Sequence, residues 1–131
     1  MQAAKRRAGI GVSCAVLFAA LLISGCAGPR LGSPGSSETG LASYYAHKFH
    51  GRSTASGEIY DETQLTAAHR KLDFGTRVRV TRLDTGNSLV VRINDRGPFV
   101  KGRIIDLSFR AAERLNFIRE GLVKVRVEVL P

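Results

Sequence analysis

The alternation of apolar and charged residues near the C-terminus constrains the fold of this chain more than any other feature. Residues 123–129 read Val-Lys-Val-Arg-Val-Glu-Val. A period of two places one side of an extended strand against a core and the other side in solvent, and a helix cannot present this pattern on one face. The sequence therefore predicts a half-buried strand here.

Two further runs alternate in the same way on either side of a turn signal. Val78 and Val80 alternate with arginines, and residues 89–93 carry apolar side chains at every second position. The cluster Asp84-Thr85-Gly86-Asn87 lies between them, so residues 77–93 are predicted to form a β-hairpin. Shorter strands are expected at Leu41–Ala46 and Arg103–Leu107.

One helix is predicted after the last of these short strands. Ser108 is a suitable N-cap for a helix over Phe109–Asn116, which contains two alanines and a leucine, and Gly121 marks the exit from the following loop. Many short strands with a single helix indicate a mainly β fold, a small β-barrel. The chain of 131 residues is long enough for one domain and too short for an α/β barrel of about 250 residues.

The first 25 residues are typical of an export signal. Lys5, Arg6 and Arg7 precede the uncharged apolar stretch Ala8–Ile23, which is shorter than the about 20 residues of a membrane span. The ending Leu22-Ile23-Ser24-Gly25-Cys26 resembles the bacterial lipobox, whose cysteine carries lipid in the mature protein. An uncleaved N-terminal anchor and an ordinary signal with a chance Gly-Cys are the alternatives.

This segment divides the chain into three expected parts. They are a signal peptide at 1–25, a lipidated flexible tether rich in Gly, Pro and Ser at 26–39, and the folded domain at 40–131. Ala27 follows the cysteine, which in Gram-negative lipoproteins implies sorting to the outer membrane, facing the periplasm. Cys14 would leave with the signal and Cys26 would carry lipid, so thiol chemistry is excluded.

The charge balance points to anionic surroundings. The formal net charge is +9, and the 17 basic and 11 acidic residues after residue 25 leave +6. Nucleic acid is a poor partner for an exported protein, so membrane surfaces and cell-wall carboxylates are the expected polyanions. Dispersed arginines that serve solubility alone are the equally simple alternative.

The densest group of reactive side chains lies in the middle of the chain. It comprises Gly57–Asp61, then His69, then Ile93–Phe99. Asp95 follows a predicted strand and precedes Gly97-Pro98, so its carboxylate is expected at a strand end where a cleft can form. Asp and Asn before Gly-Pro are also ordinary turn formers, and spacing alone leaves that interpretation open.

Several blocks of the sequence closely resemble one family, the rare lipoprotein A family. The blocks cover residues 40–45, 49–58, 65–69, 74–80, 90–99 and 102–108. The resemblance implies a six-stranded double-psi β-barrel. Some members of the family are lytic transglycosylases that cleave peptidoglycan strands, with a preference for strands without stem peptides, and others bind without cutting. The sequence keeps both an enzyme and a non-catalytic peptidoglycan-binding lipoprotein as hypotheses.

Two departures from the family pattern bear on function. Many relatives carry a C-terminal repeat domain that binds denuded glycan, whereas this sequence ends at Pro131 and has no room for one. The family often has Trp-Tyr-Gly where this sequence has Tyr44-Tyr45-Ala46. A sugar-stacking indole is then replaced by a phenol, or Tyr44 simply packs in the barrel.

The resemblance assigns roles to the central group of residues. Asp95 is the first candidate for an acid that protonates the glycosidic oxygen and then, as carboxylate, deprotonates the muramoyl C6 hydroxyl. Glu58 and Asp61 are expected to line the same cleft and to keep Asp95 protonated, and Glu58 is the alternative acid. His69 is expected to orient a carboxylate by hydrogen bonding, or merely to cap a turn after residues 66–68.

Further residues are assigned to substrate binding or to structure. Tyr44, Tyr45, Arg96 and Phe99 are the expected substrate-binding side chains. Arg96 would favour a charged Asp95 if it pointed inward, but adjacent side chains at a strand end usually point apart. Asp106 is expected to be a satisfied carboxylate of the barrel wall.

No cofactor or metal is expected. His47 and His50 lie three residues apart in a predicted loop, without the i, i+4 spacing of helical zinc sites, and nothing fixes further ligands. The expected partners are peptidoglycan strands and, through Cys26, the lipid bilayer, and the protein is expected to be a monomer.

Overall fold

A computed structural model describes residues 9, 11 and 30–131 of the chain. The predicted signal peptide, except Gly9 and Gly11, and the predicted lipidation site Cys26 lie outside the described residues. Within the part that is described, no helix has the length and apolar character needed to span a membrane.

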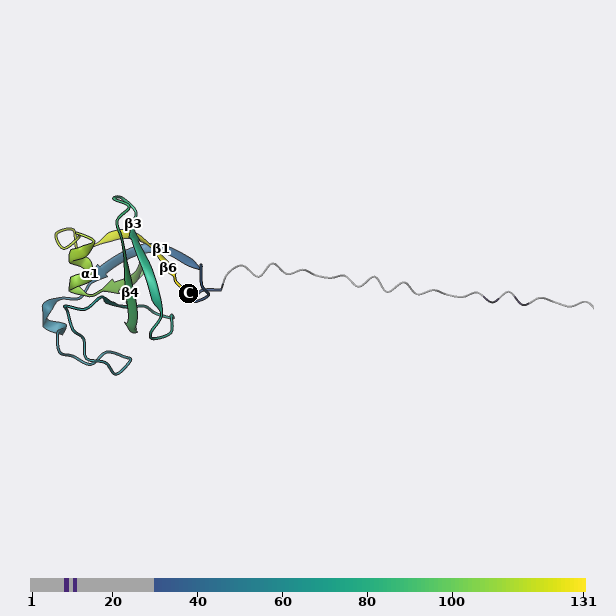
Figure 1. Cartoon of the computed structure of the whole chain (residues 1–131), viewed down its shortest axis with the longest axis horizontal. Coiled ribbons are helices and arrows are strands. Elements are labelled where there is room, and N and C mark those ends of the chain that lie inside the picture. The colour runs from purple at the N-terminus through teal and green to yellow at the C-terminus, as the bar shows by residue number, and fades with distance from the viewer. Residues whose placement is uncertain (1–8, 10, 12–29) are drawn as a thin grey trace, which may run out of the picture.

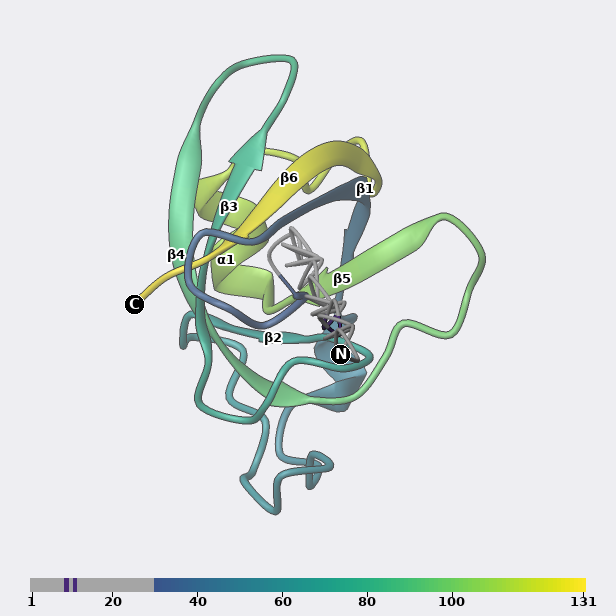
Figure 2. The ribbon, with the colours of Figure 1, turned by 90° about the vertical axis from the view of Figure 1, so that its right-hand side faces the viewer.

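Six strands close into a barrel (Figures 1 and 2). Their order around the barrel is β1-β5-β2-β4-β3-β6, with β1 and β5 parallel, β2 and β4 parallel, and the other pairs antiparallel. The strands are β1 (Ser37–Tyr44), β2 (Thr66–Ala68), β3 (Arg77–Arg82), β4 (Ser88–Asp95), β5 (Arg103–Leu107) and β6 (Val123–Val129). The predicted mainly β barrel is confirmed.

The core follows the alternation seen in the sequence. Every valine of the 123–129 run is buried, and β3 buries Val78 and Val80 while Arg77 and Arg79 are exposed. The hairpin predicted over 77–93 is present as β3 and β4. The largest fully buried side chains are Phe117, Ile93, Ile105, Leu107 and Leu115.

The helix is present and slightly shorter than predicted. α1 spans Phe109–Arg114, and the Ser108 hydroxyl accepts a hydrogen bond from the amide of Ala111 at 3.2 Å. The same hydroxyl donates to the carbonyl of Gln64 at 2.5 Å, which ties the helix start to the chain before β2. The helix ends early because Asn116 has a φ of +57°, outside the right-handed helical region.

The tether predicted over 26–39 is too long. Its last three residues belong to β1, where Ser37 lies opposite Glu128 and Glu38 opposite Val127 of β6. Before the strand, the amide of Gly35 donates to the carbonyl of Val129 at 2.9 Å. The backbone N–H and C=O groups of β6 need hydrogen-bond partners along the whole strand. Residues 37–39 supply them, and β1 therefore begins before its short apolar run.

One strand was not predicted. β2 contains only three residues, all buried, and pairs with β4 on one side and β5 on the other. Three residues are too few to display a period of two. In addition, all three are buried, so the strand has no alternation of apolar and polar residues to detect.

A long connection joins β1 to β2 and projects from one end of the barrel, at the lower left of Figure 1. It includes the short 3₁₀ helix η1 (His47–Phe49) and an isolated bridge between Ser53 and Ile59. The last residue of β4, Asp95, contacts this connection through the amide of Ala55. The candidate site lies at this junction.

Candidate functional site

A cleft of about 240 Å³ opens between the barrel and the connection from β1 to β2. It contains one carboxylate, one guanidinium and three aromatic rings. The lining residues are Tyr45, Phe49, Arg52, Ser53, Thr54, Tyr60 and Asp95. An aromatic wall with a few polar groups is the usual composition of a site that binds a small ring-shaped ligand.

A β-bulge turns Asp95 toward this cleft. In the parallel pairing of β2 with β4, Ala67 lies opposite Ile93 but Ala68 lies opposite Asp95, so β4 carries one extra residue. Strict alternation after Ile93 would direct Asp95 into the core. The extra residue reverses this order, because Asn94 is buried and Asp95 is partly exposed.

Three donors fix the carboxylate of Asp95. The Tyr45 hydroxyl donates to Oδ2 at 2.5 Å, and the amides of Ala55 and Arg96 donate to Oδ1 at 2.8 and 2.9 Å. Oδ1 is therefore occupied by two backbone groups. Oδ2 has one partner and retains the capacity to interact with a ligand.

Tyr45 is held in place as a neutral donor. Its ring packs against Tyr60 at a centroid distance of 4.7 Å and against Phe49 at 5.8 Å. Burial, and next the hydrogen bond to Asp95, raise the pKa of the Tyr45 phenol far above its ordinary value of 10.0. The hydroxyl is therefore protonated at neutral pH.

Glu58 does not contact Asp95 and is engaged elsewhere. Its Oε1 accepts from Arg92 at 2.7 Å and its Oε2 from the Asn94 amide at 2.8 Å. These two hydrogen bonds, the one from Arg92 foremost, lower the pKa of Glu58. Glu58 is also not among the residues that line the cleft, so its position argues against Glu58 as the acid.

Asp61 is also separate from Asp95 in the hydrogen-bond network. Its Oδ1 accepts from the hydroxyl of Thr63 at 2.7 Å and from the amide of the same residue at 2.9 Å. Both bonds lower the pKa of Asp61. The residue begins a turn in which Gln64 donates its amide to the Asp61 carbonyl at 3.1 Å, which is a structural role.

His69 points away from the cleft. Its side chain is 3% exposed, and Nδ1 accepts from the amides of Lys71 and Leu72, both at 3.1 Å. The proton must then be on Nε2, which lies 3.0 Å from Oε2 of Glu38. Only the backbone of His69 reaches Asp95, by donating its amide to the Asp95 carbonyl at 3.1 Å. The imidazole orders the loop after β2 and does not touch the Asp95 carboxylate.

Arg96 also turns away from Asp95, as its position after the strand end suggested. Its Nη1 donates to the carbonyls of Leu72 at 2.7 Å and His69 at 3.3 Å. The guanidinium lies 4.0 Å from the centroid of the Phe74 ring. Arg96 therefore braces the loop between β2 and β3 and is not among the residues that line the cleft.

The remaining predicted binding residues are divided between the core and the surface. Tyr44 donates its hydroxyl to the carbonyl of Ile118 at 2.8 Å and meets Phe109 and Phe117 edge-on, so it packs in the barrel wall. Phe99 is 79% exposed and lies outside the cleft. Of the four residues predicted to bind substrate, only Tyr45 lines it.

Asp106 is a satisfied carboxylate of the barrel wall, as predicted. Its Oδ1 accepts from Nη2 of Arg103 at 2.5 Å and from the hydroxyl of Ser43.

Several cleft residues were assigned no role by sequence reasoning, although Tyr60 lies in the central group Gly57–Asp61. Phe49, Arg52 and Tyr60 carry no chemistry-specific spacing, and only the fold of the connection brings them beside Asp95. A usable signal was present, because Phe49 and Arg52 lie in a block that carried the family resemblance.

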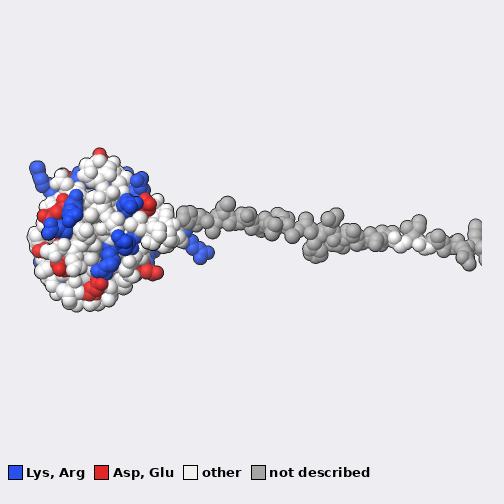
Figure 3. Space-filling model, viewed as in Figure 1, with Lys and Arg blue, Asp and Glu red and all other residues white. Residues whose placement is uncertain are grey.

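Among residues 30–131, no three His, Cys, Asp or Glu side chains are grouped so that they could hold a metal ion. His47 instead pairs with Glu62 at 2.6 Å, and Nδ1 of His50 accepts from the Glu62 amide at 3.1 Å. Figure 3 shows Lys and Arg interspersed with Asp and Glu on the visible face, in line with dispersed surface charge.

A sequence model of the family described as "Lytic transglycolase" matches residues 37–127, which include β1 to β5, most of β6 and every residue that lines the cleft. The chain belongs to this family. The resemblance to the rare lipoprotein A family is thereby confirmed.

Curated relatives of this lytic transglycolase family are similar over the same region. "Endolytic peptidoglycan transglycosylase RlpA" of Vibrio cholerae is 52% identical over 96 residues, which are 73% of this chain and 36% of the relative. "Probable endolytic peptidoglycan transglycosylase RlpA" of Nostoc is 57% identical over 93 residues, 70% of this chain and 25% of the relative. The chain thus spans about a quarter to a third of the length of these relatives.

Solved structures with the same fold are more distant in sequence. Streptomyces papain inhibitor has a TM-score of 0.62 at 23% identity and covers 75% of this chain and 97% of its own. A Clavibacter michiganensis expansin in complex with cellohexaose has a TM-score of 0.57 at 16% identity, covering 73% and 51%. These similarities concern the fold, and the six-stranded double-psi β-barrel implied by the resemblance is confirmed.

Proposed function

We propose that this domain is an endolytic lytic transglycosylase that cuts peptidoglycan glycan strands. Asp95 is the proposed general acid and, in the second step, the general base. Family membership and the names of the relatives support the reaction class. The observation that carries the assignment to Asp95 is its position in the cleft. It is the one carboxylate among the described lining residues, and Oδ2 has one hydrogen-bond partner.

The proposed reaction needs one proton donor and no water. Protonated Asp95 gives its proton to the oxygen that links N-acetylmuramic acid to N-acetylglucosamine, and the bond from that oxygen to C1 breaks. The C6 hydroxyl of the muramoyl sugar then attacks C1, and the carboxylate of Asp95 takes the hydroxyl proton. The product is a 1,6-anhydromuramoyl end, and Asp95 is protonated again.

The neighbours of Asp95 have supporting roles in this proposal. Tyr45 is protonated at neutral pH, and its hydroxyl fixes the direction of Oδ2 by donating a hydrogen bond to it. The rings of Tyr45, Phe49 and Tyr60 offer apolar faces to a sugar, and their π-electron faces favour the positive charge that develops at C1.

A non-catalytic glycan-binding role is the second candidate. One observation favours it: Glu58, Asp61 and His69 make their hydrogen bonds away from Asp95, so the cluster of acid groups expected from the sequence is not assembled. A binder needs the aromatic cleft but not a proton donor. A single acid still suffices for the transglycosylase reaction, which keeps the enzyme as the preferred function.

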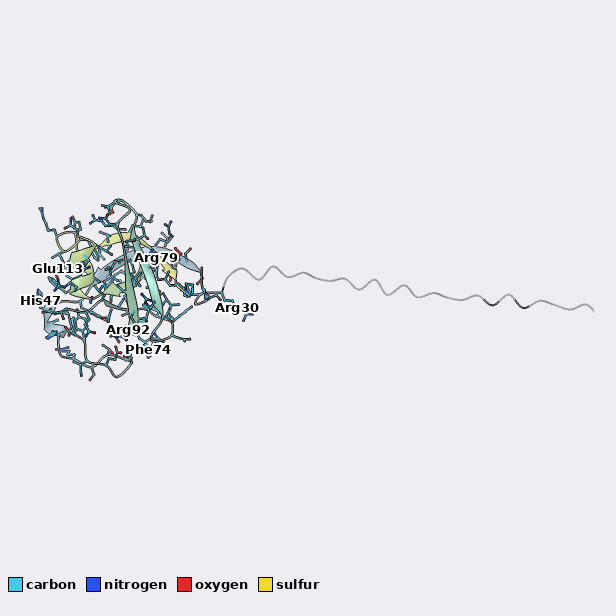
Figure 4. The ribbon with its side chains drawn as sticks, viewed as in Figure 1. Arg30, His47, Phe74, Arg79, Arg92 and Glu113 are labelled. Carbon is cyan, nitrogen blue, oxygen red and sulfur yellow. The ribbon has the colours of Figure 1, made fainter. Side chains whose placement is uncertain are left out.

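The envelope location belongs to the same proposal. Cys26 would be lipidated after removal of residues 1–25 and would hold the domain at the outer membrane, facing the periplasm, as a monomer. Figure 4 shows His47, two residues after Tyr45, at the opposite end of the domain from Arg30, which is the described residue closest in sequence to Cys26. This arrangement supports a cleft that faces away from the proposed anchor.

Cleavage is tested with the full chain purified in detergent. The protein is incubated with sacculi stripped of stem peptides by an amidase, and anhydromuramoyl ends are sought by mass spectrometry. Wild-type protein and the control Asp73→Asn, whose exposed carboxylate lies outside the cleft, should both produce them. Asp95→Asn should lose at least 100-fold in kcat, roughly the contribution of general acid catalysis.

The other outcomes are equally informative. Binding to stripped sacculi without anhydromuramoyl products from wild-type protein would select the binding function. Unchanged cleavage by Asp95→Asn would assign the proton transfer to another residue.

A further inference from the structure

Among residues 30–131, Arg52 is a cation of the cleft that has no anionic partner. Its side chain is exposed and lines the same cleft as Asp95. None of the ion pairs formed within residues 30–131 includes it, although Arg82, Arg92 and Arg103 each pair with a carboxylate. A guanidinium that faces a binding cleft and has no acid of its own is available to an anion from outside.

The backbone at Arg52 is hydrogen-bonded on both its amide and its carbonyl. The amide of Arg52 donates to the carbonyl of Phe49 at 3.1 Å, and its carbonyl accepts from the amide of Tyr60 at 2.7 Å. Ser53, the next residue, forms the bridge with Ile59. The guanidinium is therefore presented from a fixed point, which reduces the entropy lost when it binds a ligand.

A series of side-chain contacts links the Arg52 guanidinium to Asp95. The guanidinium lies 5.3 Å from the centre of the Phe49 ring, and the ammonium of Lys48 lies at 5.3 Å from the same ring. Phe49 contacts Tyr45, and Tyr45 donates to Asp95. Two cations therefore lie beside the Phe49 ring, and Tyr45 connects this ring to the carboxylate.

The proposed substrate carries a matching anion. Every muramoyl sugar has a lactyl ether with a carboxyl group, and the neighbouring glucosamine has none. In a strand without stem peptides this group is a free carboxylate, whereas a stem peptide converts it to a neutral and bulkier amide. Arginine matches carboxylates with two parallel N–H donors, and does so better than any other side chain.

We propose that Arg52 binds the free lactyl carboxylate of a muramoyl sugar held in the cleft, and that this contact makes the site selective for peptide-free strands. The inference rests on the proposed substrate but not on cleavage. Arg52 acts as a specificity residue, which fixes the muramoyl sugar with respect to Asp95 and does not take part in proton transfer.

Binding of two related ligands tests the inference without requiring turnover. The full chain carrying Asp95→Asn, in detergent, is titrated calorimetrically with a peptide-free tetrasaccharide of alternating N-acetylglucosamine and N-acetylmuramic acid. The comparison ligand is chitotetraose, which has the same β-1,4 backbone without lactyl groups. Adding Arg52→Gln should weaken binding of the muramoyl ligand about tenfold and leave chitotetraose binding unchanged.

Matched variants separate this contact from a general effect of charge. Arg79→Gln removes the same charge from an exposed position on β3, which Figure 4 shows away from His47, and should not alter either affinity. Arg52→Lys should recover part of the loss, since a lysine keeps the charge but not the two-pronged geometry. Thermal melting of each variant establishes that it is folded.

Three results would overturn the inference. These are equal affinity of the Asp95→Asn protein for the two ligands, an equal loss for both ligands in Arg52→Gln, and no binding of the muramoyl ligand at all. A protein that binds selectively through Arg52 but never cleaves would retain this inference while the enzymatic proposal fails. The two proposals can therefore fail independently.

Discussion

At the scale of single residues, the pair formed by Tyr45 and Asp95 is the chemical centre of the cleft. The phenol belongs to the residue directly after β1 and the carboxylate to the last residue of β4, and their oxygens lie 2.5 Å apart. Because burial and Asp95 both raise the pKa of Tyr45, the phenol acts only as a donor. Its expected role is to position the carboxylate.

Replacing Tyr45 by Phe tests this positioning role. The ring and its contacts with Phe49 and Tyr60 are kept, and only the hydroxyl that donates to Asp95 is lost. We expect kcat for stripped glycan to fall about tenfold with little change in KM, since the aromatic surface remains. Steady-state kinetics on solubilised strands measures both constants. An increase in KM at unchanged kcat would instead make Tyr45 a binding residue.

Glu58 gives a pH-dependent contribution to stability. Hydrogen bonds from Arg92 and Asn94 lower its pKa below the ordinary value of 4.5. A lowered pKa stabilises the folded protein above pH 4.5, and this stabilisation is lost as the pH falls through the lowered value. The effect is small, below about 1 kcal/mol, because the two side chains of the ion pair are 38% and 42% exposed.

The matching experiment compares wild-type protein with Glu58→Gln by urea unfolding at pH 7 and at about pH 3. Gln keeps one acceptor oxygen, so the variant removes the charge together with one of the two hydrogen bonds. The variant should be less stable at pH 7, and the difference should shrink at the lower pH. Glu113→Gln, whose nearest cation is Nε of Arg110 at 3.9 Å, is the control. A difference that stays constant with pH would contradict the assignment.

At the scale of elements, β1 pairs with β5 on one side and with β6 on the other, and it is tightly packed at Gly40. Gly40 lies opposite Val125 of β6, and a Cβ at this position would lie 2.5 Å from Cγ2 of Ile104 and 3.3 Å from the carbonyl oxygen of Gly102. Only glycine allows β1 to approach the residues around the start of β5 this closely.

Gly40→Ala should therefore destabilise the protein by about 1–3 kcal/mol, the usual cost of overpacking. Urea unfolding measures the change, and Ser37→Ala at an exposed position of the same strand is the control. In an Ile104→Ala background the clash with Cγ2 is removed, and the cost of Gly40→Ala should fall. Equal costs in the two backgrounds would show that the side chain of Ile104 does not limit the approach.

At the scale of the whole molecule, closure of the barrel leaves none of the six described strands with a free edge. Each strand is hydrogen-bonded on both sides, so the strands should open together rather than singly. The connection that carries Phe49, Arg52 and Tyr60 lies outside this ladder, apart from a few local hydrogen bonds and the contacts to Asp95. The proposed binding residues therefore lie outside the closed ladder of strands, on the less protected part of the molecule.

Hydrogen exchange followed by NMR checks this distribution of stability. Amides of β3, β4 and β6 should exchange only through global unfolding, with one common free energy. Exposed amides of residues 47–63 should exchange at least about 100-fold faster, through local opening. Exchange of β2 or β5 at the rate of the connection would show that the barrel is not one cooperative unit.

The sequence alone determined the barrel and most of its strands. The 123–129 run, the 77–93 hairpin and the Ser108 cap predict local structure because the interactions involved span only a few residues. The extension of β1 to Ser37 and the existence of β2 are set by pairing with distant strands, and no local pattern encodes them.

The site was determined only in part. The sequence and the family resemblance indicated Asp95 and Tyr45, and both line the cleft. The bulge at Asn94 decided that Asp95 faces the cleft, and the Glu38 and Arg92 partners decided that His69 and Glu58 do not join it. Side-chain direction depends on contacts between segments far apart in the chain. Residue types can therefore indicate the chemistry, but only the tertiary structure brings the reacting groups together.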